Sequence, residues 1–94
     1  MKNERQFDLP NRSAGNLYVN NLAKTIDENR LRDMFGRFGI IMSVKVELNK
    51  TNKSSKGYGF VCFSKPEEAA TAIREMNGKF IEGKLISVNF SKGK

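Results

Sequence analysis

The sequence contains no histidine, no tryptophan and a single cysteine, Cys62. Without histidine the chain lacks a common general base of enzymes and the commonest side-chain metal ligand. One cysteine cannot form an internal disulfide, a Cys-x-x-Cys copper site or a four-cysteine iron–sulfur cluster. We therefore expect no metal site and no cofactor, and the lone thiol suits a reducing compartment.

Long hydrophobic segments are also missing. No apolar run approaches the roughly 18 residues that a membrane span requires, and the first residues do not resemble a signal peptide. Acidic residues are few, because 17 Lys and Arg stand against 10 Asp and Glu, a formal net charge of +7. Such a charge favours an anionic partner, above all nucleic acid or an acidic protein surface. We expect a soluble intracellular protein with no membrane partner.

A chain of 94 residues is long enough for one domain and leaves little room for an enclosed active site. The polar stretch 1–15 is predicted to be a disordered leader or linker. The folded domain is predicted over 16–91, and 92–94 form a basic tail. No internal repeat or low-complexity segment interrupts this single unit.

The spacing of apolar residues predicts six elements in the order β-α-β-β-α-β. The predicted strands cover 16–22, 40–48, 56–63 and 85–90. Thr25 and Glu28 have the spacing of a capping box, which predicts that Thr25 caps the first helix. The second helix is predicted to begin at Pro66 and to end at Asn77-Gly78.

The two remaining connections are predicted to be turns. The loop 49–55 has hairpin character and carries Lys50 and Lys53, and 79–84 is a short hairpin or turn with Phe80 partly buried. Two helices can cover only one face of a four-stranded sheet. The sequence therefore predicts an α+β sandwich with one open sheet face.

The octapeptide KGYGFVCF indicates which face is open. One side of this strand carries Gly57, Gly59, Val61 and Phe63, and the other carries Lys56, Tyr58, Phe60 and Cys62. Burying a lysine is costly, so the lysine side is predicted to face solvent and the glycine side to let a helix pack closely. By the same alternation Tyr18 and Asn20 face solvent. The aromatic residues predicted in the core are Phe35, Phe38 and Phe63.

An open face that carries Tyr18, Tyr58 and Phe60 is a candidate binding surface. Flat rings can stack on nucleic-acid bases, and a single strand is favoured because bases in a duplex already stack on each other. Residues 39–65 contain five lysines, among them Lys45, and one acid. Six of the ten acids lie instead in the two predicted helices, which predicts that charge is sorted by face.

The segments LYVNNL (17–22) and KGYGFVCF (56–63) resemble the two signature motifs, a hexamer and an octamer, of the RNA recognition motif (RRM) family. The octamer matches the family pattern at every position, and the resemblance covers about residues 16–91. It implies a ferredoxin-like βαββαβ sandwich, with a four-stranded antiparallel sheet and two helices on one face. It also implies single-stranded RNA as the partner of a monomeric domain.

The resemblance further implies roles for residues of the open face. Tyr18 and Phe60 would each stack a base, Tyr58 would pack against sugars between two nucleotides, and Lys56 would contact phosphate. Further residues expected to contact base edges or phosphates are Asn20, Lys45, Ser87, Asn89 and Lys92. Cys62 stands at the variable position of the octamer and is expected to have no role.

Within the family, FGRFGIIMSVKV and MNGKFIEGKLISV resemble the third and fourth RRMs of cytoplasmic poly(A)-binding proteins. This resemblance implies one module of a longer chain that binds adenine-rich or A/U-rich mRNA. It also implies a cytoplasmic location, with or without shuttling to the nucleus.

The predicted strand order is compatible with two other functions. An acylphosphatase-like enzyme shares the strand order but needs an anion-binding loop with a catalytic arginine after the first strand, where this chain has NNLAKT. We therefore expect no enzymatic activity. An RRM can also bind a protein partner through its helical face, and this alternative stays open.

Overall fold

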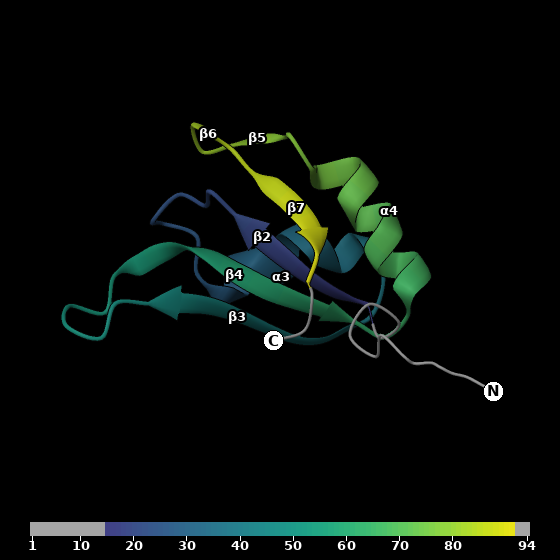
Figure 1. Cartoon of the computed structure of the whole chain (residues 1–94), viewed down its shortest axis with the longest axis horizontal. Coiled ribbons are helices and arrows are strands. Elements are labelled where there is room, and N and C mark those ends of the chain that lie inside the picture. The colour runs from purple at the N-terminus through teal and green to yellow at the C-terminus, as the bar shows by residue number, and fades with distance from the viewer. Residues whose placement is uncertain (1–14, 92–94) are drawn as a thin grey trace.

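A computed structural model describes residues 15–91 (Figure 1). Four strands form an antiparallel sheet in the order β3-β4-β2-β7, and β5 and β6 form a separate hairpin. The elements are β2 (Asn16–Asn20), α3 (Glu28–Phe35), the 3-10 helix η1 (Gly36–Phe38), β3 (Ile41–Leu48), β4 (Ser55–Phe63), α4 (Pro66–Met76), β5 (Phe80–Ile81), β6 (Lys84–Leu85) and β7 (Ser87–Phe90). The predicted α+β fold with its βαββαβ order is confirmed. The predicted leader up to residue 14 and the tail 92–94 lie outside the described residues.

The hydrophobic core lies between one face of the sheet and the two helices. Alternate residues of the central strands, such as Leu17 in β2 and Val61 in β4, are fully buried, together with Leu31 and Phe35 of α3 and Ala72 of α4. In Figure 1, α3 lies behind the sheet. Among residues 15–91 no helix is long and apolar enough to cross a membrane. The opposite face of the sheet is left uncovered by either helix.

The start of α3 differs from the predicted capping box. Asp27, not Thr25, is the N-cap, and its Oδ1 accepts a hydrogen bond of 2.9 Å from the backbone N–H of Arg30. Thr25 donates its hydroxyl hydrogen bond to Glu82 instead. Glu28 accepts from the Val46 N–H at 3.0 Å rather than reaching back to the cap. Aspartate is at least as good an N-cap as threonine. Asp27 caps the helix because Thr25 and Glu28 are engaged by Glu82 and Val46, which lie far away in the sequence.

The glycines of β4 make room for backbone atoms of neighbouring segments, and not for a closely packed helix as the sequence predicted. A Cβ on Gly59 would lie 2.3 Å from the carbonyl oxygen of Lys45 in the neighbouring strand β3. Gly57 has φ of +88°, a conformation that only glycine adopts without strain. The glycines therefore allow β3 to approach closely and β4 to bend at its start.

The β5–β6 hairpin turns through Glu82 and Gly83, whose φ values of 50° and 86° are typical of a type I′ turn. Ile81 packs against the core, so its neighbour Phe80 points away from it. Phe80 is 69% exposed. The prediction that Phe80 is partly buried was therefore wrong. Of the other aromatic residues predicted in the core, Phe35 and Phe63 are fully buried and Phe38 packs at its margin.

Candidate nucleic-acid interface

Three aromatic rings meet on the open face of the sheet. Tyr18 of β2 lies directly opposite Phe60 of β4, and Tyr58 lies two residues before Phe60 on the same side. The ring centroid of Tyr18 is 5.5 Å from that of Phe60 and 5.7 Å from that of Tyr58, and Tyr58 and Phe60 are 6.3 Å apart. The tilted and edge-to-face arrangement stabilises the cluster without covering its outer surface. Each ring is half-buried, which leaves aromatic surface open for stacking.

Polar side chains extend this aromatic cluster into two rows across the sheet. The first row runs from Lys45 in β3 through Phe60 and Tyr18 to Asn89 in β7, each residue directly opposite the next. With about 4.8 Å between neighbouring strands, this row is about 14 Å long. The second row consists of Tyr58, Asn20 and Ser87. The two rows place aromatic surface, amide groups and a cation on one face.

The strands β2, β4 and β7 hold this surface in place because the opposite side of each is buried. Val19, Val61 and Val88, which alternate with the outward residues, have no exposed surface. A shift of register by one residue would move these valines to solvent and the rings into the core. Burial of the inner face therefore fixes the position of the outer one.

Of the nine predicted contact residues, seven lie in the two rows: Tyr18, Asn20, Lys45, Tyr58, Phe60, Ser87 and Asn89. Lys56 is exposed at the start of β4, in a stretch where the pairing with β3 is irregular, and it borders the second row. Lys92 lies outside the described residues. Sequence reasoning missed Ser43, an exposed residue opposite Cys62, although its spacing of two from Lys45 places it on the same face.

The chemistry of this surface is that of recognition. The rings offer flat apolar faces, and Lys45 offers a charge with three N–H donors. Asn20 and Asn89 each carry an amide that can both donate and accept, as base edges require, and the Asn89 amide donates to Ser87 Oγ at 3.3 Å. Within residues 15–91 no group of three or more His, Cys, Asp or Glu side chains could hold a metal ion.

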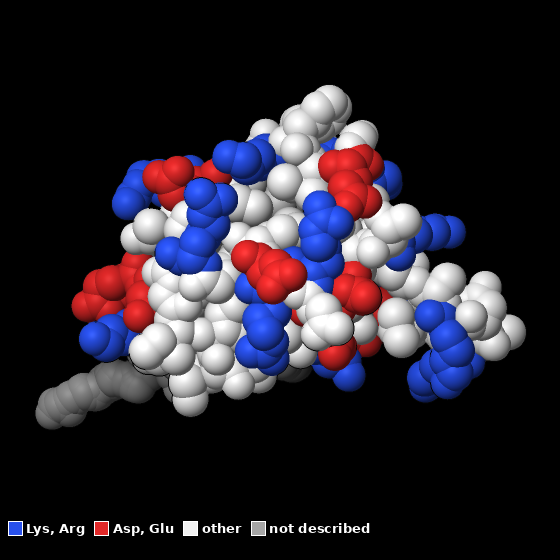
Figure 2. All heavy atoms as spheres, turned by 180° about the vertical axis from the view of Figure 1, so that it is seen from behind, with Lys and Arg blue, Asp and Glu red and all other residues white. Residues whose placement is uncertain are grey.

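The helical side of the molecule carries charges of both signs. Figure 2 shows the molecule from behind, with acidic and basic side chains interspersed. In α3 the two acids Glu28 and Asp33 are balanced by Arg30 and Arg32, so that the helix has no net charge. Charge is therefore less sorted by face than the positions of the acids alone predicted, and the helices are not a uniformly acidic surface.

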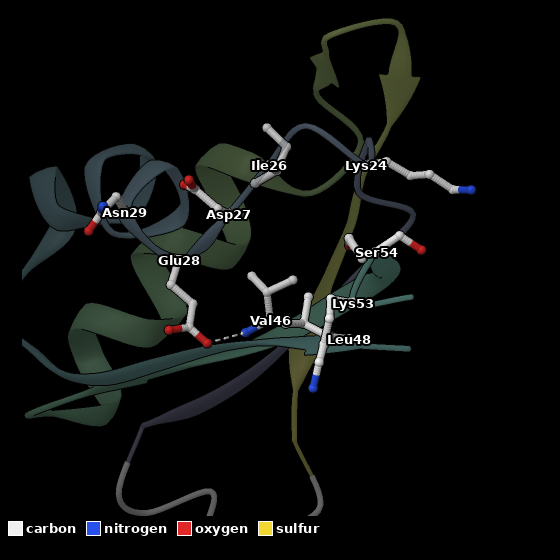
Figure 3. Close-up of a pocket in the computed structure, with 10 residues that line it drawn as sticks. Lys24, Ile26, Asp27, Glu28, Asn29, Val46, Leu48, Lys53 and Ser54 are labelled. Atoms are coloured by element: carbon white, nitrogen blue, oxygen red, sulfur yellow. Dashed lines mark hydrogen bonds between the residues drawn. The ribbon is translucent and has the colours of Figure 1, made fainter. Parts of the chain in front are cut away.

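A pocket of about 510 Å³ lies away from the rings, between the start of α3, strand β3 and the β3–β4 loop (Figure 3). Its lining mixes carboxylates of Asp27 and Glu28, lysines 24 and 53, and apolar side chains such as Leu48. The Glu28 carboxylate accepts from Val46 N–H, which would otherwise be unpaired at this edge of the sheet. The Glu28 carboxylate in this pocket therefore satisfies a backbone donor of the edge strand β3, and we assign no ligand to the pocket.

Comparison with known protein families places this geometry in context. The family model of the RNA recognition motif matches residues 17–87. Polyadenylate-binding protein 6 of Arabidopsis thaliana is 47% identical over 85 residues. This alignment includes 90% of the present chain and 16% of the plant protein, so the chain spans a small part of that relative's length.

Solved structures share the fold as well as the sequence pattern. The second RRM domain of a yeast poly(U)-binding protein is 33% identical with a TM-score of 0.75, over 81% of this chain and 92% of that one. A Sxl-lethal protein–RNA complex is 31% identical with a TM-score of 0.81, over 95% of this chain and 55% of that one. The two motifs, the strand order and these likenesses agree: the chain belongs to the RNA recognition motif family.

Proposed function

We propose that this domain binds single-stranded RNA on the open face of its sheet, without catalysing a reaction. The observation that supports the proposal most strongly is the row formed by Lys45, Phe60, Tyr18 and Asn89. Two bases stack on Tyr18 and Phe60, and stacking on an aromatic side chain is worth roughly 1–3 kcal/mol per base. Lys45 and Lys56 contact phosphates at the β3–β4 side of the face, and Lys92, which follows β7 in the sequence, is a further candidate for a phosphate contact.

Tyr58 fills the space between the two stacked nucleotides and packs against their sugars. The outward polar groups of the second row, Asn20 and Ser87, hydrogen-bond base edges, as does Asn89. A duplex would not satisfy this arrangement, because its bases already stack on one another and are not free to lie on the rings. The proposal therefore requires an unpaired strand.

We further propose that the preferred RNA is rich in adenine. The relative with 47% identity is named a polyadenylate-binding protein, which supports this preference. The yeast structure comes from a poly(U)-binding protein, so uracil is the natural competitor in a test. The resemblance of the sequence to modules of cytoplasmic proteins supports a cytoplasmic location and a role as one module of a longer chain.

An NMR titration of the isotope-labelled domain tests the proposal, with single-stranded oligo(A), oligo(U) and oligo(C) of about eight nucleotides each. We expect the largest shift changes at Tyr18, Tyr58 and Phe60, with oligo(A) bound most tightly. Ile40, 65% exposed and distant from the rows in the pairing scheme, is the internal control and keeps its shift. Equal affinity for all three RNAs would overturn the adenine preference alone. Shift changes confined to α3 and α4, or none, would overturn RNA binding by the sheet.

A further inference from the structure

We propose that Phe80 and Leu85 of the β5–β6 hairpin form an additional base-binding site, which holds one nucleotide beyond those stacked on Tyr18 and Phe60. The inference rests on the proposed function and extends its surface. Neither residue belongs to the two motifs of the sheet. The proposed site therefore adds to the surface that these motifs form.

Phe80 and Leu85 expose large apolar side chains at adjacent positions. The side chain of Phe80 is 69% exposed and that of Leu85 is 55% exposed. The two residues are directly opposite each other in the antiparallel hairpin, so their side chains lie on the same side of it. Together they offer an aromatic ring with an aliphatic neighbour, a surface on which a base can stack.

The side chains of this pair point to the same side as the RNA-binding rows. Ile86 and Val88 are buried in the core at 2% and 0% exposure. Leu85 and Ser87 alternate with them and therefore face away from the core, on the side of the second row. A strand rises about 3.3 Å per residue, and Leu85 comes two residues before Ser87, which places it about 7 Å outside the second row at the start of β7. In Figure 1 the hairpin adjoins the start of β7.

The hairpin is held in a fixed position, which reduces the entropy that binding would cost. Its Glu82 carboxylate accepts hydrogen bonds from Thr25 and Arg30 before and within α3. On the other side, the Asn21 side-chain amide donates to the Leu85 carbonyl at 2.8 Å. The end of β2 is thus tied directly to the residue that carries the proposed site.

Charge around the pair favours RNA over a protein as its occupant. Lys79 and Lys84 flank the pair and are exposed, and Lys84 Nζ lies 3.3 Å from Asn21 Oδ1. The single acid of the segment, Glu82, is engaged by Arg30. Two apolar side chains are also few for a protein interface, which typically involves about 20–30 residues on each side. Continuity with the rows and a basic border together indicate a nucleotide.

The test compares two lengths of the RNA that binds best, about four and about eight nucleotides, because only the longer strand can reach past the second row. Affinities of the full 94-residue chain and of Phe80→Ala are measured by fluorescence anisotropy. We expect Phe80→Ala to weaken binding of the longer RNA roughly 5- to 150-fold and to leave the shorter RNA within about twofold. Leu85→Ala should act in the same direction with a smaller effect.

Ile40→Ala is the matched control, because Ile40 is similarly exposed at 65%. Its carbonyl accepts a hydrogen bond from Ser64 N–H just after the end of β4, whereas Gly57, at the start of β4, bonds to Leu22 just after the end of β2, which is the end tied to the hairpin. Ile40→Ala should bind both RNAs like the parent chain. If Phe80→Ala binds both lengths as tightly as the parent, the additional site is overturned while the proposed function stands. If the parent chain binds neither length, both fail. A parent chain that sediments as a dimer, and a Phe80→Ala variant that sediments as a monomer, would overturn the site in favour of a second copy.

Discussion

Phe60 and Phe63 are the same residue type in the same strand, yet their environments are opposite. Phe63 has no exposed surface and packs in the core, whereas Phe60 is half-buried within the ring cluster. Their spacing of three places them on different faces of β4, as strand alternation requires. At the scale of the single residue, the face of the strand on which a side chain lies decides whether it contributes to folding stability or to binding.

Alanine substitution at these two positions should therefore have opposite consequences. Phe60→Ala should cost about 1–3 kcal/mol of RNA binding and about 1 kcal/mol or less of folding free energy, because most of its contacts are with other surface rings. Phe63→Ala should cost roughly 3–5 kcal/mol of folding free energy, as a large core cavity does. Urea unfolding and RNA affinity, measured on both variants, check this. A Phe60→Ala variant that unfolds as readily as Phe63→Ala would show that the ring belongs to the core.

The assignment of side chains to the two faces of a strand was also the feature of the interface that the sequence predicted best. The alternation in KGYGFVCF and in LYVNNL assigned the outward rings and the inward valines without any knowledge of strand order. The role of Gly59 could not be predicted in this way, because the close carbonyl oxygen belongs to Lys45, fourteen positions earlier in the chain. A local pattern indicates that a glycine is unusual but does not identify what approaches it.

At the scale of the element, the β5–β6 hairpin and the start of α3 depend on each other. Thr25 and Arg30 both donate to Glu82, which lies 57 and 52 residues further along the chain. This contact explains why the capping box prediction failed, since Thr25 is engaged by the hairpin and Asp27 caps α3 instead. Sequence spacing favoured Thr25 because a capping box is a local pattern, and the competing partner is not local.

The same contact should make the hairpin sensitive to acid. The hydrogen bond from Thr25 and then that from Arg30 lower the pKa of Glu82 below its ordinary value of 4.5. A carboxylate with a lowered folded-state pKa contributes stability that is complete above the unfolded-state pKa and is lost as the pH falls through the folded-state pKa. We therefore expect Glu82→Gln to be less stable than the parent near neutral pH, and this difference to shrink below about pH 4.5.

Urea unfolding of both chains from about pH 6 to about pH 3 measures this difference. A background that carries Thr25→Ala and Arg30→Gln is the control, because Glu82 then has neither donor and Glu82→Gln should change little at any pH. A stability difference that stays constant across the range in the parent background would contradict the assigned cause.

At the scale of the whole molecule, the net charge of +7 acts together with the arrangement of the open face. The helical side carries both signs, whereas the face with the rings carries Lys45 and is bordered by Lys56.

The βαββαβ order followed from apolar periodicity because each element is long enough to show its period. The hairpin was less predictable, since strands of two residues show no alternation and only the structure revealed the exposure of Phe80.

Affinity for RNA should fall as the salt concentration rises, with a slope proportional to the number of phosphates contacted. Each neutralised phosphate of a single strand contributes about −0.7 to the slope of log affinity against log salt, so three or four contacts predict a slope of roughly −2 to −3. Lys45→Ala should make the slope shallower by about 0.7 and weaken all RNA sequences alike. Lys65→Ala, which removes an exposed charge at the N-cap of α4, is the matched control and should leave the slope unchanged.

Fluorescence anisotropy over a series of salt concentrations gives these slopes for the three chains. A slope near zero would mean that the rings bind bases without phosphate contacts, which would contradict the roles of Lys45 and Lys56. Equal flattening by Lys45→Ala and Lys65→Ala would mean that RNA responds to the net charge of the molecule and not to its open face. Only a difference between these two variants supports a phosphate track beside the rings, because both substitutions remove the same charge from the chain.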